Sequence, residues 1–401
     1  MMNNKILWIC SIAWLHENRN YFPEATYPGI VSGSAFQQAI IEGLEEQNYS
    51  IRILSDCDMS SGKRIEWSHN KINKDIRISG YSNKFLRIPK KIKEFYFEIK
   101  KGEILKEIDI VFAYEMHIPF LFCLYKIKKI NPKIKTVLIC PDLSIYMDLN
   151  SKNKFFKHLL KRIESKIARI LLKNIDGYIL FTEQMQSYFA EFNKPYVVVE
   201  GVYRDKYSLA NVPKKPFIMH AGSLHYNVGI EELIEAFEQL QNKEIELWFF
   251  GSGAMDNYIK VKAKNNNRIK HMGFVDPKEL FEYEKKATLL VNVRNPKEEY
   301  TKYSFPSKTF EYLASGTPFL STDLPGIPSE YKKYIYLIPD NNIETIKIGL
   351  ENILDLREEE RYKYGQRARE YVIKNKNKIV QSKKIIDFLS NLSKEKIKGD
   401  K

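Results

Sequence analysis

Short apolar runs alternate with helix-type patterns along almost the whole chain. Residues 5–10 (KILWIC) and 50–55 (SIRILS) are apolar runs of strand length, and a helical pattern at 34–47 separates them. The same order returns at 109–114 (DIVFAY) and 136–140 (TVLIC), again with a helical pattern between the two runs. Apolar strands that alternate with helices predict parallel sheets covered by helices on both faces.

The alternation restarts after a polar segment that contains Pro213 and Pro216. Strand-length runs then recur at 216–223, 245–253 and 288–293, each followed by a helical pattern. In such sheets ligands bind outside the carboxyl ends of the strands, so attention falls on the loops that follow them. We therefore predict two doubly wound, Rossmann-like α/β domains that face a central cleft. The predicted bounds are 1–205 for the first domain, 206–375 for the second, and 376–401 for a C-terminal helix that packs back on the first domain and ends in a polar tail.

The bulk composition agrees with this division. A length of 401 residues fits two domains, and 44% hydrophobic with 28% charged residues is typical of a globular protein. Cys10, Cys57, Cys123 and Cys140 show no pairing or metal-type spacing, which favours a reducing cytoplasm. Residues 6–9 read as a buried strand, because no small-residue cleavage site of a signal peptide follows them. No uncharged apolar run reaches the ~18 residues of a membrane span.

Positive charge is concentrated in one part of the chain. The net charge is +14, and residues 51–173 alone hold 27 Lys and Arg against 13 Asp and Glu, an excess of 14. Two stretches, 83–103 and 153–173, mix these cations with apolar residues at helical spacing, which predicts amphipathic helices. Such helices either bind an anionic membrane surface or bury their apolar face in the domain core, and composition does not decide between the two. Nucleic acid is not an expected partner, since no nucleic-acid-binding module is present.

One segment of the second half combines features of an anion-binding helix. Ser304 is a candidate N-cap with Pro306 in the first turn, and Gly316 ends the helix. Lys308 and Glu311 are three residues apart and share a face. A helix N-terminus can hold a phosphate, and a carboxylate on that face can accept hydrogen bonds from the vicinal hydroxyls of a sugar. This combination predicts a nucleotide site, with a capped surface helix and an ordinary Lys–Glu pair as the structural alternative.

Residues 306–331 (PSKTFEYLASGTPFLSTDLPGIPSEY) resemble the donor-site segment of retaining GT-B glycosyltransferases in the large family 4 group. Residues 291–308 resemble a bacterial subgroup that builds surface polysaccharides such as capsule or O-antigen, and 219–237 and 248–259 agree in order and spacing. The resemblance covers nearly all of the second half and is weak in the first. It implies transfer of a sugar from a nucleotide-diphosphate sugar to a lipid-linked saccharide acceptor, with no cofactor and no metal ion.

The resemblance also implies roles for matching positions, foremost Glu311, which would hold the nucleotide ribose. The other implied donor-binding residues are those whose backbone would hold the diphosphate (Ser304, Phe305, Ser307 and Lys308), those that allow close approach or end a strand beneath the nucleotide (Gly222, Ser223, Gly251 and Gly253), and those that would lie against the base (Phe274 and Val275).

Three positions depart from the family pattern. Ser223 and Val228 stand where the family usually has an Arg and a Lys that neutralise the diphosphate. We expect Lys308 and Arg294 to supply this charge instead. Tyr303 stands where the first of two family glutamates would touch the donor sugar, so the identity of that sugar is not assigned.

Polar residues after the strands of the first domain are candidates for the acceptor side. Asp142 follows the run 136–140, near the place where the family commonly has a His that faces the anomeric carbon, and is the first catalytic candidate. His117 and Glu115 follow the run 109–114 and are the next candidates, with a structural role as the alternative for each. A long loop precedes a helix that we expect to start at about Ser34, and a structureless loop of this length is usually functional. His16, Gly33 and Ser34 are the acceptor-side candidates in this region.

Together these observations predict a retaining glycosyltransferase of bacterial surface-polysaccharide synthesis. A cytoplasmic location is expected, with peripheral association at the inner face of the plasma membrane as an open question. A nucleotide-sugar epimerase of the same architecture remains an alternative. A non-catalytic partner that keeps the fold is another, and the altered loop at residues 223–228 would fit it.

Overall fold

The chain folds into two compact units, each with its own sheet. The structure is a computed structural model, and it describes residues 5–12, 31–57, 65–67, 75–79, 87–101, 104–143, 154–204, 209–210 and 212–399. Unit 1 consists of Met1–Val202 and Lys378–Lys401, and unit 2 consists of Tyr203–Asn377. The last segment of the chain therefore belongs to the same unit as the first.

The described part of unit 1 contains an eight-stranded sheet in the order β3-β4-β2-β1-β5-β6-β7-β8. Neighbouring strands are parallel except the edge pair β3 and β4, which is antiparallel. Every residue of β5 and β6 is buried, as expected for central strands covered on both faces. The strands are β1 (Lys5–Ser11), β2 (Ser50–Cys57), β3 (Ile65–Trp67), β4 (Asp75–Ser79), β5 (Ile110–Tyr114), β6 (Lys135–Cys140), β7 (Gly177–Leu180) and β8 (Tyr196–Val198).

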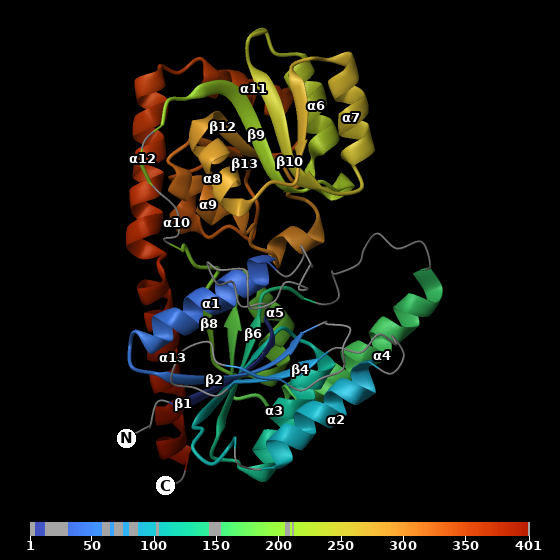
Figure 1. Ribbon diagram of the computed structural model, residues 1–401, viewed down its shortest axis with the longest axis vertical. Coiled ribbons are helices and arrows are strands. Elements are labelled where there is room, and N and C mark those ends of the chain that lie inside the picture. Colours follow the sequence, from blue (N-terminus) through green and yellow to red (C-terminus); the bar gives the residue numbers. More distant parts are fainter. Residues whose placement is uncertain are drawn as a thin grey trace. The chain divides into compact units, whose positions relative to one another are not determined.

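Helices cover both faces of this sheet (Figure 1). On one face α1 packs against the C-terminal helix α13, and Ile385, Phe388 and Leu389 of α13 are buried in one core cluster with Ile40 and Trp8. On the other face α3 packs against both α2 and α4. The helices are α1 (Val31–Glu45), α2 (Arg87–Lys100), α3 (Ile118–Ile130), α4 (Lys154–Leu172), α5 (Gln186–Phe189) and α13 (Lys378–Gly399), with 3-10 turns η4 (Glu183–Met185) and η5 (Ala190–Phe192) beside α5.

Unit 2 has a six-stranded sheet within the described residues, and all its paired strands are parallel. The strand order β11-β10-β9-β12-β13-β14 places β9, the first strand in sequence, near the centre. The strands are β9 (Lys215–Ser223), β10 (Glu246–Ser252), β11 (Ile269–Gly273), β12 (Ala287–Asn292), β13 (Phe319–Thr322) and β14 (Tyr336–Ile338).

Two core clusters line the two faces of this second sheet. Helices α6, α7 and α11 supply apolar side chains to one cluster, and α8, α9 and α12 supply the other. Figure 1 shows where these helices lie around the sheet. The helices are α6 (Ile230–Glu238), α7 (Asp256–Asn265), α8 (Pro277–Lys286), α9 (Lys308–Ser315), α10 (Ser329–Lys332), α11 (Ile343–Leu354) and α12 (Glu358–Asn375), with 3-10 turns η6 (Tyr226–Val228) and η7 (Glu299–Lys302).

The predicted architecture of two doubly wound α/β domains is confirmed, and two helix starts differ from prediction. Helix α1 begins at Val31, so Ser34 lies inside its first turn and not at its start. Helix α9 begins at Lys308 and not at Ser304, although Gly316 ends it as predicted, with φ 74°. Among the described residues we find no helix that combines the length and the apolar character needed to cross a bilayer.

Candidate functional site

The carboxyl edge of the unit 2 sheet gathers the predicted donor-site residues. Gly222 and Ser223 end β9, and they lie in register with Gly251 and Ser252 at the end of β10. Arg294 follows the end of β12 by two residues, and β12 is the neighbour of β9 on the side away from β10. Because parallel strands end at one edge, segments far apart in sequence meet here.

Two glycines shape this edge in different ways. Gly251 has φ 116°, and a Cβ at this position would overlap the carbonyl oxygen of Gly222. The ends of β9 and β10 can therefore approach each other only because Gly251 has no side chain. Gly222 has φ 139°, and a Cβ there would have no neighbour within 4 Å. The backbone at Gly222 thus borders open space, where a ligand can approach it closely.

Helix α9 starts late because the residues before it are drawn into the core. Phe305 is buried, and its ring packs against Phe310 and Tyr331 with centroid distances of 5.1 and 5.6 Å. Pro306 is also buried, whereas Ser307 is exposed at the residue before the helix. The side chain of Phe305 is a core group, so only its backbone could serve the diphosphate role that the resemblance implies.

Tyr312 ties α9 to the end of β9. Its hydroxyl accepts a hydrogen bond from the N–H of Ala221 at 2.7 Å and donates to the carbonyl of the same residue at 3.2 Å. Tyr312 is 1% exposed, so both bonds lie in the interior. This contact fixes the helix that carries Lys308 and Glu311 to the residue next to Gly222.

Lys308 lies between two carboxylates. Its ammonium pairs with Glu311, one helical turn along α9, and with Glu284 on α8, where the Nζ to Oε1 distance is 3.4 Å. The Glu284 side chain is 0% exposed, and its Oε2 has no hydrogen-bond partner among the described residues. Glu311 is half-exposed, with 49% of its side chain accessible. The triad therefore runs from the interior of unit 2 to its surface.

The pKa directions of this triad follow from its burial and charges. Burial raises the pKa of Glu284, whereas the Lys308 ammonium beside it opposes this effect by favouring the charged carboxylate. Burial alone would lower the pKa of Lys308, but Glu284 and Glu311 together raise it above its ordinary value. Lys308 thus stays protonated, and its charge is already used by carboxylates of its own chain.

Sequence reasoning missed Glu284. The side chains of Phe281 and Glu284, three residues apart, both face the interior from α8. A carboxylate on the apolar face of an amphipathic helix is the signal that could have found it, because a buried charge needs a partner.

Arg294 carries an unused donor at the same edge. Its Nε is buried and has no hydrogen-bond acceptor among the described residues. Its carbonyl accepts a hydrogen bond from the hydroxyl of Thr322 at 2.6 Å, which fixes the loop after β12 to β13. Buried donors are nearly always paired, so this Nε marks a place for an acceptor that the chain does not supply.

The remaining donor-side residues lie around these groups. Phe274, just after β11, is 67% exposed, and Val275 beside it is half-buried. Tyr300 donates its hydroxyl to the carbonyl of Asn227 at 2.9 Å, so the loop before α9 is fixed to the turn after β9. The Tyr303 hydroxyl lies 3.4 Å from a carboxylate oxygen of Glu299. Ser304 is half-buried, and Gly253 follows the end of β10.

The acceptor-side carboxylate candidates lie at the carboxyl edge of the unit 1 sheet. Glu115 directly follows β5 and has φ 76°, a left-handed conformation that non-glycine residues rarely adopt. Burial raises the pKa of Glu115 to about 7, with further increases from Asp142 and Asp56, although solvent reaches the side chain. Asp142 follows β6 by two residues. The two predicted carboxylates are therefore close enough to influence each other.

Neighbouring polar groups at this edge have structural contacts. Asp56, at the end of β2, pairs with Lys91 of α2 and accepts a hydrogen bond from the hydroxyl of Ser11. Both members of the Asp56–Lys91 pair are almost fully buried. His117 precedes α3, and its ring packs edge to face on Phe120 with a centroid distance of 5.1 Å.

The acceptor-side candidates near α1 are placed differently from prediction. Gly33 and Ser34 lie in the first turn of the helix, and Ser34 is 0% exposed. A Cβ at Gly33 would lie 3.3 Å from the hydroxyl oxygen of Tyr114, so the space above this glycine is occupied by an aromatic ring. His16 lies outside the described residues.

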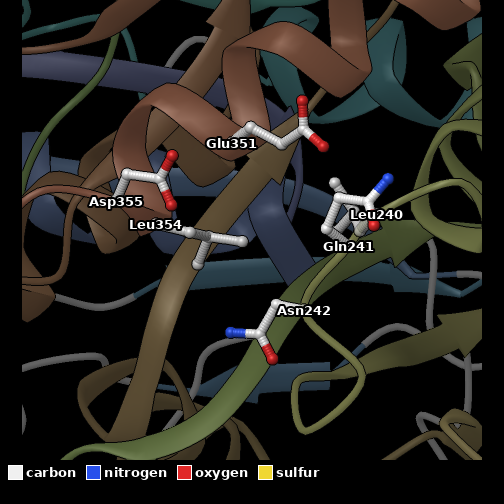
Figure 2. A pocket seen from close by; sticks show the side chains of 6 residues that line it. All are labelled: Leu240, Gln241, Asn242, Glu351, Leu354 and Asp355. Atoms are coloured by element: carbon white, nitrogen blue, oxygen red, sulfur yellow. The ribbon is translucent and has the colours of Figure 1, made fainter.

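A hollow of about 290 Å³ lies at the opposite edge of the unit 2 sheet. It is lined by residues 240–242, which precede β10, and by Glu351, Leu354 and Asp355 at the end of α11. Figure 2 shows the carboxylates of Glu351 and Asp355 on the helix and Asn242 on the facing loop. None of the predicted site residues lines this hollow, and its carboxylates do not suit a phosphate ligand.

The comparisons with known proteins concern the family and the fold. Residues 204–371, which lie within unit 2, match the family model of glycosyl transferases group 1. No curated protein matches the chain in sequence. Solved structures do match it over nearly its whole length.

Three of these structures illustrate the likeness. Sucrose-phosphate synthase from Thermosynechococcus elongatus is 14% identical, covers 97% of this chain and 99% of its own, and gives a TM-score of 0.71. HepE of Anabaena, in complex with UDP, is 14% identical over 96% of this chain and 100% of its own, with a TM-score of 0.63. WaaG, a glycosyltransferase involved in lipopolysaccharide biosynthesis, is 14% identical over 94% of this chain and 98% of its own, with a TM-score of 0.62.

At these identities the likeness shows the fold, which is the two-domain GT-B fold. The family match is independent of that likeness and covers the unit that contains Arg294, Lys308 and Glu311. With a glycosyl transferases group 1 match in its second unit and the GT-B fold throughout, the chain is a glycosyltransferase.

Proposed function

We propose that this glycosyltransferase takes its sugar from a nucleotide-diphosphate sugar, bound at the carboxyl edge of the unit 2 sheet. The observation that carries the proposal is the buried Nε of Arg294, which lacks an acceptor among the described residues at the edge where Gly222 borders open space. A diphosphate would supply that acceptor and would neutralise the guanidinium charge. The UDP in the HepE structure supports a donor of this class.

The donor site would act mainly on the leaving group. The bond between the anomeric carbon and the terminal phosphate oxygen breaks, and a new bond forms to the acceptor hydroxyl oxygen, whose proton passes to the departing diphosphate. Arg294 and the N–H groups at the start of α9 would stabilise the negative charge that collects on the diphosphate. Glu311 would hold the ribose hydroxyls. Retention of the anomeric configuration is proposed on the resemblance of residues 306–331 to retaining enzymes.

We further propose a lipid-linked saccharide acceptor in bacterial surface-polysaccharide synthesis, used at the inner face of the membrane. Ile163, Ile167 and Ile170 of α4 are exposed and recur at helical spacing, so they form an apolar stripe. Arg162 and Lys166 are exposed on the same helix. A stripe of this kind bordered by cations suits an anionic bilayer, and the involvement of WaaG in lipopolysaccharide biosynthesis supports the acceptor class.

The donor proposal is tested by binding and transfer. Purified protein is titrated with UDP-, GDP- and dTDP-sugars, followed by incubation with a membrane extract and analysis of the glycan products. We expect one nucleotide series to bind and to support transfer, and Glu311→Ala to abolish both. Glu344→Ala, which removes an exposed carboxylate from α11, is the matched control and should change neither. If no nucleotide sugar binds or reacts, the proposal is wrong, and sugar isomerisation without acceptor would identify an epimerase instead.

The membrane proposal is tested with vesicles. We expect the protein to sediment with vesicles that contain anionic lipid and to be released as salt is raised, because screening weakens the cationic contribution. Ile167→Glu should reduce sedimentation, whereas Ile348→Glu on α11, a similarly exposed isoleucine of unit 2, should not. Equal binding of both variants would contradict docking through α4.

A further inference from the structure

Lys308 cannot easily serve a diphosphate in the arrangement that unit 2 adopts. To reach a ligand, its ammonium would have to leave Glu284, which is 0% exposed and already has one oxygen without a hydrogen-bond partner among the described residues. Removing one partner from a buried ion pair leaves an uncompensated charge and is strongly unfavourable. The interior carboxylate therefore holds the ammonium in place.

The ion pair between Lys308 and Glu311 indicates a role for Lys308. Its ammonium pairs with Glu311, whose side chain is 49% exposed and would otherwise sample several rotamers. A charge-assisted hydrogen bond to one carboxylate oxygen restricts those rotamers and leaves the other oxygen available to accept hydrogen bonds. The carboxylate is thereby fixed relative to α9, which Tyr312 ties to β9.

We propose that Lys308 is a positioning residue for Glu311, held by the buried Glu284, and that it does not bind the diphosphate. The inference rests on the proposed function, in which Glu311 accepts hydrogen bonds from the ribose of a nucleotide. The sequence led us to expect that Lys308 and Arg294 together neutralise the diphosphate. In this inference only Arg294 and the backbone N–H groups do so. The α8–α9 contact thus acts on the ribose side of the ligand.

Two affinity ratios separate the two roles of Lys308. The ratio of UDP to 2′,3′-dideoxy-UDP affinity measures what the ribose hydroxyls contribute, and the ratio of UDP to UMP affinity measures what the second phosphate contributes. Both are determined by calorimetry on the full chain. Because each is a ratio within one variant, a general loss of stability or affinity cancels.

We expect Lys308→Met to lower the hydroxyl ratio by about tenfold, the effect of losing a hydrogen bond to a charged group, and to leave the phosphate ratio unchanged. Glu284→Gln should lower the hydroxyl ratio less, since an amide keeps the shape of the carboxylate without its charge. Lys308→Arg should restore part of it. Lys347→Met is the matched control, because Lys347 makes a similar pair with Glu344 on α11 and should affect neither ratio.

Other outcomes overturn the inference. If Lys308→Met lowers the phosphate ratio and spares the hydroxyl ratio, Lys308 is a diphosphate ligand. If a folded Lys308→Met protein keeps both ratios, the triad is structural only. If the wild-type protein binds no UDP, the same ratios are measured with GDP and its analogues, and failure of UDP, GDP and dTDP alike to bind would overturn the proposed function itself.

Discussion

His220 gives unit 2 a dependence on pH that can be traced to one side chain. It is almost fully buried near the end of β9, and its Nδ1–H donates to the carbonyl of Val291 at 3.2 Å. Burial lowers its pKa to about 4, although the hydrogen bond to Val291 acts in the opposite direction. The folded unit therefore holds a neutral imidazole over the range in which an unfolded chain, with a pKa near 6.5, takes up a proton.

We expect the stability contributed by neutral His220 to be complete above pH 6.5 and to be lost as the pH falls toward 4, by up to about 1.4 kcal/mol for each pH unit. Urea unfolding of the wild-type protein and of His220→Phe at pH 7, 6 and 5 tests this. The free energy of unfolding should decrease less with acidification in the variant. Curves that run parallel over this range would assign the pH dependence to other groups.

A pair of glycine substitutions should separate packing from ligand access. In Gly251→Ala the new methyl would overlap the Gly222 carbonyl, so we expect a loss of several kcal/mol in stability of unit 2. In Gly222→Ala the methyl meets nothing within 4 Å, so the cost is mainly backbone strain of about 1–3 kcal/mol, and nucleotide affinity should fall. Denaturation and UDP titration of both variants provide the comparison, and equal destabilisation would contradict it.

For single residues, the sequence could predict side-chain contacts between close neighbours in one helix, but not contacts between residues far apart in the chain. Lys308 and Glu311 are one helical turn apart, so their shared face follows from spacing alone. Glu284 is 24 residues before Lys308, and its contact depends on how α8 packs against α9. The unpaired Nε of Arg294 could not be predicted either, because it depends on which acceptors the folded chain brings near.

Among the secondary-structure elements, the C-terminal helix α13 contributes several buried side chains to the core of unit 1. Ile385, Phe388, Leu389 and Leu392 are buried in the core cluster that also contains the central strands of unit 1. A Cβ at Gly177 of β7 would lie 2.6 Å from the ring of Phe388, so this strand has no side chain where the ring packs. The helix is thus an integral part of the unit 1 core.

Phe388→Ala is expected to destabilise unit 1 by about 3–5 kcal/mol, the usual cost of deleting a buried phenyl ring. Unit 2 should unfold as in the wild-type protein, since its core contains no residue of α13. Of the four tryptophans, Trp8, Trp14 and Trp67 belong to unit 1 and Trp248 belongs to unit 2, so fluorescence in a Trp248→Phe background reports on unit 1. A change below 1 kcal/mol would show that α13 adds little to the core.

Element boundaries were less predictable than element types. The apolar periodicity predicted strands and helices in the correct order, but two helix starts were placed wrongly, one of them from a candidate N-cap. Ser304 is a good N-cap by residue type, yet the burial of Phe305 and Pro306 draws the preceding loop inward and delays the helix until Lys308. Tertiary packing therefore decided a boundary that local chemistry had left open.

For the whole molecule, separate cores imply separate responses to a ligand. Each unit has its own sheet and its own hydrophobic clusters. A nucleotide bound by unit 2 stabilises that unit by linkage, by about 2.7 kcal/mol at a concentration one hundred times its dissociation constant.

We therefore expect calorimetry to show two unfolding transitions, of which saturating UDP raises only one. The Phe388→Ala variant identifies the other transition as unit 1, because the substitution should lower it selectively. A single transition that shifts as a whole would show that the units unfold together, and a shift of the transition lowered by Phe388→Ala would place the nucleotide in unit 1.

The two-domain architecture was readable from the sequence because the strand–helix rhythm restarts near residue 212. The acceptor-side residues could not be predicted in the same way, because the resemblance is weak in the first half. From the sequence alone, each candidate carboxylate there could equally have a structural role. Glu115 illustrates this, because its left-handed backbone conformation is visible only in the folded chain.

The return of the chain to unit 1 at Lys378 affects the order in which the protein can fold during translation. Unit 2 is complete once Asn377 has left the ribosome, whereas the core of unit 1 still lacks Phe388 and its neighbours. Domains generally fold as units when all their residues are available. The N-terminal sheet, although made first, would therefore be the last to close, and its uncovered apolar face is where a nascent-chain chaperone would be needed.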